Sequence, residues 1–379
     1  PAPPLVTRWD LDKTYLRTEF HTLGDLLRAA LERPDQKRAV PGAARLLREL
    51  AHVGARIHIL SGSPRQMRRA IAERLSLDGV FYDELTLKPN LQNLLHLRFR
   101  ALKDQLSYKL PALLEARMRE RHVLGVPPCP EILLGDDSEA DAFVYSLYAD
   151  LCSGRVDMEQ LETVLHAGRV DSAITEQCLA AVRSLRAPRD GKDADGGRER
   201  DGRHEEARTT ASGRARFRIL IHLDQQTPPS RFASHTPRLV PFYNYAQAAL
   251  ILVDDGHLPA VAAYRVAQEL CDQFRFDLDA LARSYLDLKR RGHLNGALAR
   301  LRLLALFLGR VHLVLVGVGR VRPLRHLRAV VRLLIGLRVG LRLHLIVVHG
   351  PAGLLLAVHD VLIILIAVLV GAGAARPAA

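Results

Sequence analysis

Three short apolar segments, each followed by a polar turn, constrain the fold of this chain more than any other feature. The segments are residues 5–9, 55–60 and 131–134, and the turns after them read Asp10-x-Asp12-x-Thr14, Ser61-Gly62-Ser63-Pro64 and Gly135-Asp136-Asp137. Short apolar strands that alternate with helices are typical of an α/β fold with a mostly parallel sheet. The pattern predicts a doubly wound, Rossmann-like core. Ligands of such sheets bind outside the carboxyl ends of the strands, so we expect the three turns to meet there.

The first turn places Asp10 and Asp12 two residues apart, with the Thr14 hydroxyl at the same spacing. A turn at a strand end can aim both carboxylates into one pocket. One carboxylate then attacks an electrophile, while the other, when protonated, acts as acid and base. The alternative is a polar turn whose side chains bond to their own backbone. Short motifs recur by chance, so the first turn alone does not distinguish a catalytic pair of carboxylates from a polar turn. The other two turns provide the evidence that distinguishes them.

Together with a lysine on a helix, the three turns resemble the motif set of the haloacid-dehalogenase-like phosphatases. The matching residues are Asp10, Asp12 and Thr14, then Ser61, then the lysine, then Asp136, Asp137 and Asp141. The resemblance implies phosphoryl transfer, which needs an in-line nucleophile, neutralised oxygens and a proton for the leaving group. Asp10 is then the nucleophile that forms an aspartyl-phosphate. Asp12 would protonate the leaving oxygen and later activate water.

The same resemblance implies a magnesium site and a phosphate site. Mg²⁺ prefers oxygen ligands, and those expected here belong to Asp10, Asp12, Asp136, Asp137 and Asp141. The groups expected to bind phosphoryl oxygens are Thr14, Ser61 and the N–H of Gly62. A lysine ammonium would offset the charge of Asp10 and of the phosphate. The candidates, in order of preference, are Lys109, Lys103 and Lys88.

Residues 5–155 are more closely similar to the catalytic domain of the actin-patch-associated phosphatidate phosphatases. The similarity rests on Ser61-Gly62-Ser63-Pro64, the helix that carries Lys109, and the 135–141 run with Tyr145 four residues later. Asp137 replaces the family's Ser, and Lys13 stands where an acid is frequent. The resemblance implies hydrolysis of phosphatidate or a related phosphomonoester. Only 46 residues separate Thr14 from Ser61, which predicts an open site without a large lid.

Composition divides the chain into four segments. Residues 1–186 form the phosphatase-like domain, and 187–216, rich in charge and glycine, are expected to be a disordered linker. Residues 217–295 are expected to form a mainly helical accessory region, and 296–379 a low-complexity Leu/Val/Arg tail. Further expected elements are a strand at 79–82, a strand at 217–223, and helices at 22–51 (broken at Pro41-Gly42), 94–121 (broken at Pro111), 140–151, 155–186, 243–254, 258–274 and 277–291.

The tail accounts for most of the basic charge. From Arg300 onward there are eleven arginines and one acid, Asp360, which leaves only three of the thirteen net positive charges for the rest. We therefore expect no specific nucleic-acid binding. Residues 354–374 are about long enough to span a bilayer, but they include His359 and Asp360, which are costly there. A reading-frame artefact in the coding sequence is the preferred explanation of this tail, membrane attachment is the second, and a packed amphipathic tail is the third.

Four scattered cysteines without metal-ligand spacing, and no N-terminal signal peptide, predict a cytoplasmic protein with membrane association as an option. The expected partner is a phosphorylated substrate, with lipid phosphate favoured over phosphoprotein or nucleic-acid ends. A catalytically silent scaffold that binds a protein partner is the alternative class of function. The clustered acids argue against a scaffold, because like charges in one site repel one another.

Overall fold

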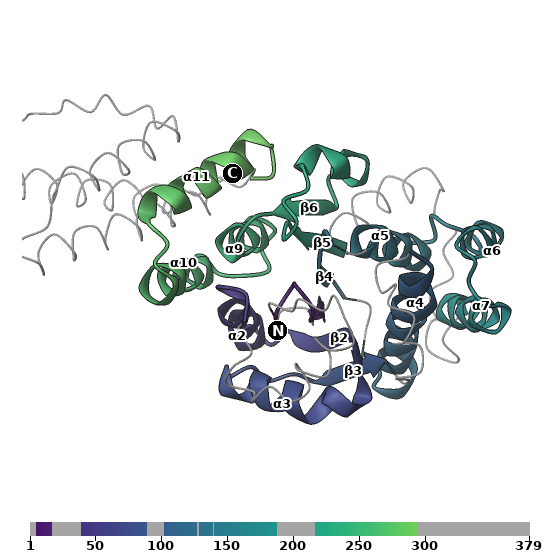
Figure 1. The fold of residues 1–379 in the computed structure, drawn as a ribbon. Coiled ribbons are helices and arrows are strands. Elements are labelled where there is room, and N and C mark those ends of the chain that lie inside the picture. The colour runs from purple at the N-terminus through teal and green to yellow at the C-terminus, as the bar shows by residue number, and fades with distance from the viewer. Residues whose placement is uncertain are drawn as a thin grey trace, which may run out of the picture. The chain divides into compact units, whose positions relative to one another are not determined.

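The computed structural model describes residues 5–16, 39–88, 102–126, 129–138, 140–187 and 217–294. The chain divides into two compact units, Pro1–Asn244 and Tyr245–Ala379. The described strands belong to the first unit and form one parallel sheet (Figure 1). They are β1 (Val6–Asp10), β2 (Arg56–Pro64), β3 (Glu84–Lys88), β4 (Glu131–Asp136), β5 (Phe217–His222) and β6 (Leu239–Phe242).

The strand order is β3-β2-β1-β4-β5-β6, and every neighbouring pair is parallel. The chain proceeds from β1 outward to β3, and then crosses back to add β4, β5 and β6 on the other side of β1. The predicted doubly wound α/β fold is therefore confirmed. The direction of winding reverses between β1 and β4, and such a switch point is where open α/β sheets bind ligands.

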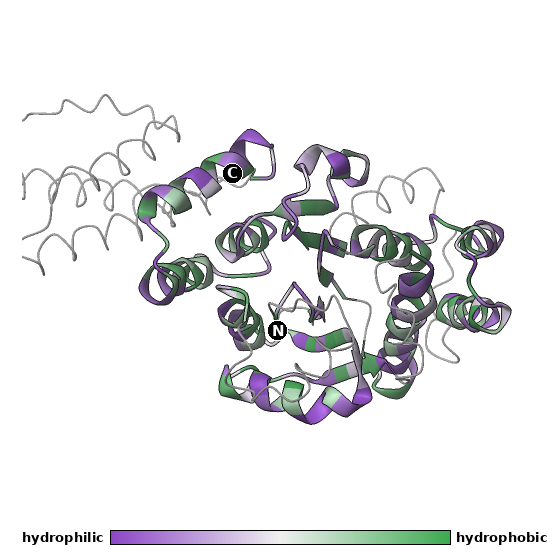
Figure 2. Cartoon of the chain, viewed as in Figure 1, coloured by the Kyte–Doolittle hydropathy of each residue, from purple (hydrophilic) through white to green (hydrophobic). Residues whose placement is uncertain are grey.

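Helices cover both faces of the sheet. Figure 1 shows α2 (Ala43–His52) on one side and α4 (Leu102–Met118) and α5 (Asp141–Cys152) on the other. Helix α3 (Arg68–Leu77) connects β2 to β3, and α6 (Met158–Ala167) and α7 (Ser172–Arg186) form an outer layer beside α4. Hydrophobic residues dominate β5 and β6 in Figure 2, and the central strands are buried along most of their length.

Two local predictions are wrong. The strand expected at 79–82 is a loop, and the strand itself follows it as β3. In β3 the buried Leu85 and Leu87 alternate with more exposed neighbours, which is the period of a strand with one buried face. Pro111 lies inside α4 and does not interrupt that helix. The predicted strands at 5–9, 55–60, 131–134 and 217–223 and the helix at 140–151 are confirmed.

The boundary of the second unit lies later than expected. β5 and β6 belong to the sheet of the first unit, so the accessory region begins at Tyr245. Its predicted helices are confirmed as α9 (Tyr245–Asp254), α10 (Ala260–Phe274) and α11 (Leu278–Arg290). Buried Gln247 joins α9 to α11, because its Nε2 donates to the Ser284 carbonyl at 2.9 Å and to Asp287 Oδ2 at 3.1 Å.

The linker at 188–216 and the tail from 295 lie outside the described residues, as do 17–38 and 89–101. The expected bilayer span at 354–374 therefore falls outside them too, as do 22 of the 46 residues between Thr14 and Ser61, where no large lid is expected. Among the residues that are described, no helix combines the length and the hydropathy required to cross a bilayer.

A buried ion network under the sheet fixes the position of α4. Arg8 on β1 is 1 % exposed, and it donates to Glu131 at 2.8 Å and to Glu120 at 2.5 Å. The ring of His58 on β2 lies 3.1 Å from the same guanidinium. Glu120 lies in the π-helical turn η3 (Arg119–Val123) that continues α4. Removing one partner from such a buried pair typically costs about 3–5 kcal/mol, so this network is a strong positional constraint.

Candidate functional site

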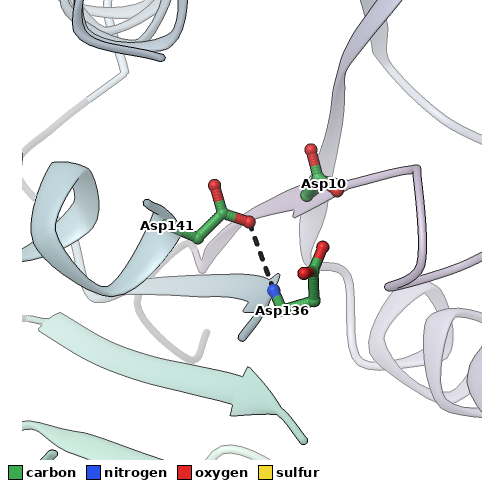
Figure 3. A group of neighbouring side chains, drawn as sticks. All are labelled: Asp10, Asp136 and Asp141. Carbon is green, nitrogen blue, oxygen red and sulfur yellow. Dashed lines mark hydrogen bonds between the residues drawn. The ribbon is translucent and has the colours of Figure 1, made fainter. Parts of the chain in front are cut away.

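Three carboxylates converge at the switch point of the sheet (Figure 3). Asp10 ends β1, Asp136 ends the neighbouring β4, and Asp141 begins α5. One carboxylate oxygen from each lies within 4.8 Å of the other two, and none of the three residues is more than 1 % exposed. Asp10 and Asp136 are more than a hundred residues apart in the sequence. They meet because β1 and β4 are parallel neighbours that end at the same edge of the sheet.

The glycine of the third turn explains how Asp141 reaches this cluster. A Cβ on Gly135 would lie 2.6 Å from the Asp141 Cβ and 2.7 Å from its Cγ, distances that packed atoms do not reach. The missing side chain lets Asp141 fold back over β4, where its Oδ2 accepts a hydrogen bond from the Asp136 N–H at 3.2 Å. The position of Asp141 in the cluster therefore depends on both Gly135, which leaves room for its side chain, and Asp136, which donates a hydrogen bond to it.

Lys109 is the lysine that the structure brings to the acids. Its Nζ lies 2.8 Å from Asp10 Oδ1 and 2.5 Å from Asp141 Oδ1, and its side chain is 1 % exposed. The residue lies on the buried stripe of α4 that includes Leu106, Leu110 and Leu113. Lys103 is exposed on the same helix, and Lys88 lies at the end of β3.

Asp12 is oriented from the β2 side. Its Oδ2 accepts hydrogen bonds from the Ser61 hydroxyl at 3.0 Å and from the Ser63 hydroxyl at 3.3 Å. The Ser63 N–H in turn donates to Ser61 Oγ at 3.0 Å. Tyr108 precedes Lys109 in α4, and its hydroxyl donates to the Ser61 carbonyl at 2.6 Å. This bond connects α4 to the end of β2. The first two sequence turns therefore meet, as expected from parallel strands.

The turn formed by residues 11–16 has its own backbone bonds. The N–H groups of Tyr15 and Leu16 both donate to the Leu11 carbonyl, at 2.9 and 2.8 Å. Thr14 is fully buried within this turn. Gly62 lies between the two serines, and apart from its chain neighbours no atom lies within 4 Å of the position that a Cβ would take.

Asp137 has a different environment from its neighbour Asp136. Its Oδ1 accepts from the Gln225 N–H at 2.8 Å, and its Oδ2 accepts from the Thr227 N–H at 2.9 Å. Successive side chains of a strand point to opposite faces, so Asp136 enters the cluster while Asp137 turns toward the loop after β5. The three clustered acids are therefore Asp10, Asp136 and Asp141.

Two tyrosines near the acids, the buried Tyr145 and the half-buried Tyr108, have raised pKa values. Burial first, and the Asp141 charge second, raise the pKa of Tyr145 well above its usual range. Burial is likewise the main reason why the pKa of Tyr108 is raised, with Asp10 and Asp12 adding to the effect and Lys109 opposing it. Both tyrosines therefore serve as hydrogen-bond donors, Tyr145 to the Leu134 carbonyl at 3.3 Å.

Sequence reasoning assigned no role to Tyr108, Ser63 or His222. Tyr108 adjoins Lys109, and Ser63 lies in a motif that was already quoted, but a single sequence does not show which side chains touch. His222 ends the apolar strand 217–222 in the same way that Asp10 and Asp136 end theirs. That strand-end position was the available signal.

The cluster has the donor set of a hard-cation site. In their ionised forms, three carboxylates and one ammonium leave two negative charges on side chains that are almost completely buried. Burying unbalanced charge is expensive, and a divalent cation with oxygen ligands would balance it. The residues that could hold such an ion are Asp10, Asp136 and Asp141. Neither a family model nor a curated protein matches this chain.

Proposed function

We propose that this protein is a Mg²⁺-dependent phosphomonoester hydrolase of the haloacid-dehalogenase-like type. The observation that carries the proposal is the placement of buried Lys109 between Asp10 and Asp141, with Asp136 in the same cluster. Mg²⁺ held by Asp10, Asp136 and Asp141 would neutralise phosphoryl oxygens. With that ion and the Lys109 ammonium supplying positive charge beside the Asp10 nucleophile, the site would suit an anionic group with an electrophilic centre, which a phosphomonoester supplies.

The chain's own residues account for each chemical step. An Asp10 oxygen attacks phosphorus, an aspartyl-phosphate forms, and the bond between phosphorus and the leaving oxygen breaks. Asp12, oriented by the hydroxyls of Ser61 and Ser63, gives its proton to the leaving oxygen. Asp12 then takes a proton from water, which attacks the phosphoryl group and releases Asp10 and inorganic phosphate. Lys109 holds Asp10 in place and offsets its charge.

The Ser61-Gly62 segment, near the end of β2, is the proposed phosphate contact. Its N–H groups and hydroxyl lie at the end of β2, beside Asp12. Preorganised donors of this kind stabilise charge that develops on transferring oxygens. Thr14, buried in the neighbouring 11–16 turn, is the other hydroxyl proposed for this site. The substrate class favoured by the sequence resemblance is a large phosphorylated molecule, with phosphatidate or another lipid phosphate first, presented at a membrane surface.

The test is Mg²⁺-dependent release of phosphate from a generic aryl phosphate. Asp10→Asn should abolish release, because the amide oxygen is a poor nucleophile, while Glu162→Gln on the exposed side of α6 should leave it unchanged. A panel of phosphatidate vesicles, phosphopeptides, polynucleotide ends and sugar phosphates then identifies the substrate class. Release by the wild type that equals release by Asp10→Asn would reject the proposal and favour the scaffold alternative.

A further inference from the structure

We infer that His222, at the end of β5, is a positioning residue for the 11–16 turn that carries Asp12. This inference rests on the proposed function for its catalytic consequence. His222 is 8 % exposed, and its Nδ1 lies 3.2 Å from the backbone carbonyl of Lys13, which is 209 residues away. His222 belongs to none of the three sequence motifs, and it lies outside the acid cluster.

The chemistry of the two atoms determines the direction of this hydrogen bond. A backbone carbonyl only accepts, so the Nδ1 atom of His222 must carry the proton and donate it to Lys13. The ring packs beside Phe242 of β6, with centroids 5.4 Å apart. The His222 carbonyl accepts from the Asp137 N–H at 3.0 Å, which connects it to the residue after Asp136. Both the backbone and the ring of His222 are therefore fixed.

Lys13 is the residue in this turn that most needs an external support. Its φ is +58°, a left-handed conformation that costs a non-glycine residue about 1–2 kcal/mol. Such conformations persist where the surroundings determine them. The Lys13 N–H donates within the turn, to the Leu16 carbonyl at 2.8 Å, while its carbonyl receives the His222 proton. Hydrogen bonds therefore hold the strained residue Lys13 at both its backbone N–H and its backbone C=O.

The loop after β5 makes a second connection to the same residue. Lys13 Nζ lies 4.0 Å from Asp224, and the side chain of Lys13 is only 14 % exposed. Asp137 holds this loop through the N–H groups of Gln225 and Thr227. The 11–16 turn is therefore held from the β2 side by the serines that bind Asp12, and from the β5 side by His222 and Asp224.

This arrangement predicts a selective effect on catalysis. A misplacement of about 1 Å in a reacting group can reduce a rate on the order of 100-fold. Loss of the His222 bond leaves Asp10, Asp136, Asp141 and Lys109 in place, so the metal cluster should survive. Asp12, one residue from Lys13, should lose its alignment.

The experiment compares two substitutions of nearly the same shape. The amide nitrogen of Asn occupies a position close to that of Nδ1 in His, so His222→Asn keeps the donor, whereas His222→Leu removes it. With an aryl phosphate, His222→Leu should lower kcat on the order of 10- to 100-fold, and His222→Asn should stay within about threefold of the wild type. Mg²⁺ affinity, measured by calorimetric titration, should be the same in both variants.

Amide hydrogen exchange provides a readout that does not depend on activity. Exchange in the peptide covering residues 11–16 should rise in His222→Leu and not in His222→Asn, with α5–α7 unchanged in both. Equal kcat values and equal exchange for the two variants would overturn the inference, as would a rise in exchange throughout the first unit. If the wild type released no phosphate but the exchange difference persisted, the proposed function would fail while the role of His222 in holding the turn would stand.

Discussion

Replacing Lys109 by Met should destabilise the metal-free protein and increase the stabilisation that Mg²⁺ confers. The ammonium of Lys109 lies 2.8 Å from Asp10 and 2.5 Å from Asp141, and Asp136 belongs to the same cluster. Met retains most of the side-chain volume but none of the charge. The three acids then repel one another at almost completely buried positions, where like charges are weakly screened.

The size of the effect follows from the burial of the pair. Removing one partner from a buried ion pair costs about 3–5 kcal/mol. For domains of about 150–250 residues, each kcal/mol shifts Tm by about 2–4 °C. The metal-free variant should therefore melt about 6–20 °C below the wild type. A bound divalent cation replaces the lost positive charge, so Mg²⁺ should raise Tm more in the variant than in the wild type.

The assay is thermal unfolding followed by calorimetry, with Mg²⁺ and with a chelator. Lys103→Met is the matched control, because Lys103 is exposed on the same helix and its loss should change stability by no more than about 0.5 kcal/mol. Equal melting temperatures for the two variants without metal would refute the electrostatic reasoning. An equal Mg²⁺-induced shift in Lys109→Met and the wild type would refute the placement of the cation at these acids.

Three further substitutions test other parts of the structure. Gly135→Ala should abolish phosphate release and weaken Mg²⁺ binding in calorimetry, because the added Cβ displaces Asp141. Gly62→Ala is the control, because its Cβ meets no atom within 4 Å, and it should retain Mg²⁺ binding. Arg8→Met should lower the free energy of unfolding in urea by about 3–5 kcal/mol, and an effect below that of a surface substitution would contradict the role of its buried pairs. Burial, followed by the charge of Arg8, holds the pKa of His58 well below 6.5, so the folded state excludes a proton that the unfolded state binds. Stability should therefore fall as the pH drops below about 6.5, and His58→Gln should show a shallower fall in urea titrations at several pH values.

The fold was largely predictable because its signals are local. The apolar runs before Asp10, Ser61 and Asp136 each predicted a strand, and the helical segments between them predicted parallel pairing. The missed strands are short or only half-buried. β3 buries one face through Leu85 and Leu87, and β6 has four residues, Leu239–Phe242, too few for a clear period.

The sequence predicted that a site exists at the strand ends more readily than it predicted which acids and which lysine belong to it. Asp136 ends β4 and Asp137 follows it directly. Only the opposite directions of these two side chains separate Asp136, inside the cluster, from Asp137, which binds the loop after β5. Three lysines were candidates, and the helical register of α4 placed Lys109 on the buried face and Lys103 on the exposed one. Both distinctions depend on the orientation of single side chains.

The sequence by itself determined that polar turns follow apolar strands, and that these turns meet where parallel strands end. This followed because hydrophobic periodicity and strand direction are encoded within a few neighbouring residues. Only the tertiary structure decided that Gly135 leaves room for Asp141, and that His222 reaches Lys13 across 209 residues. Contacts of this kind depend on how distant segments pack, and no local pattern in a single chain records that packing.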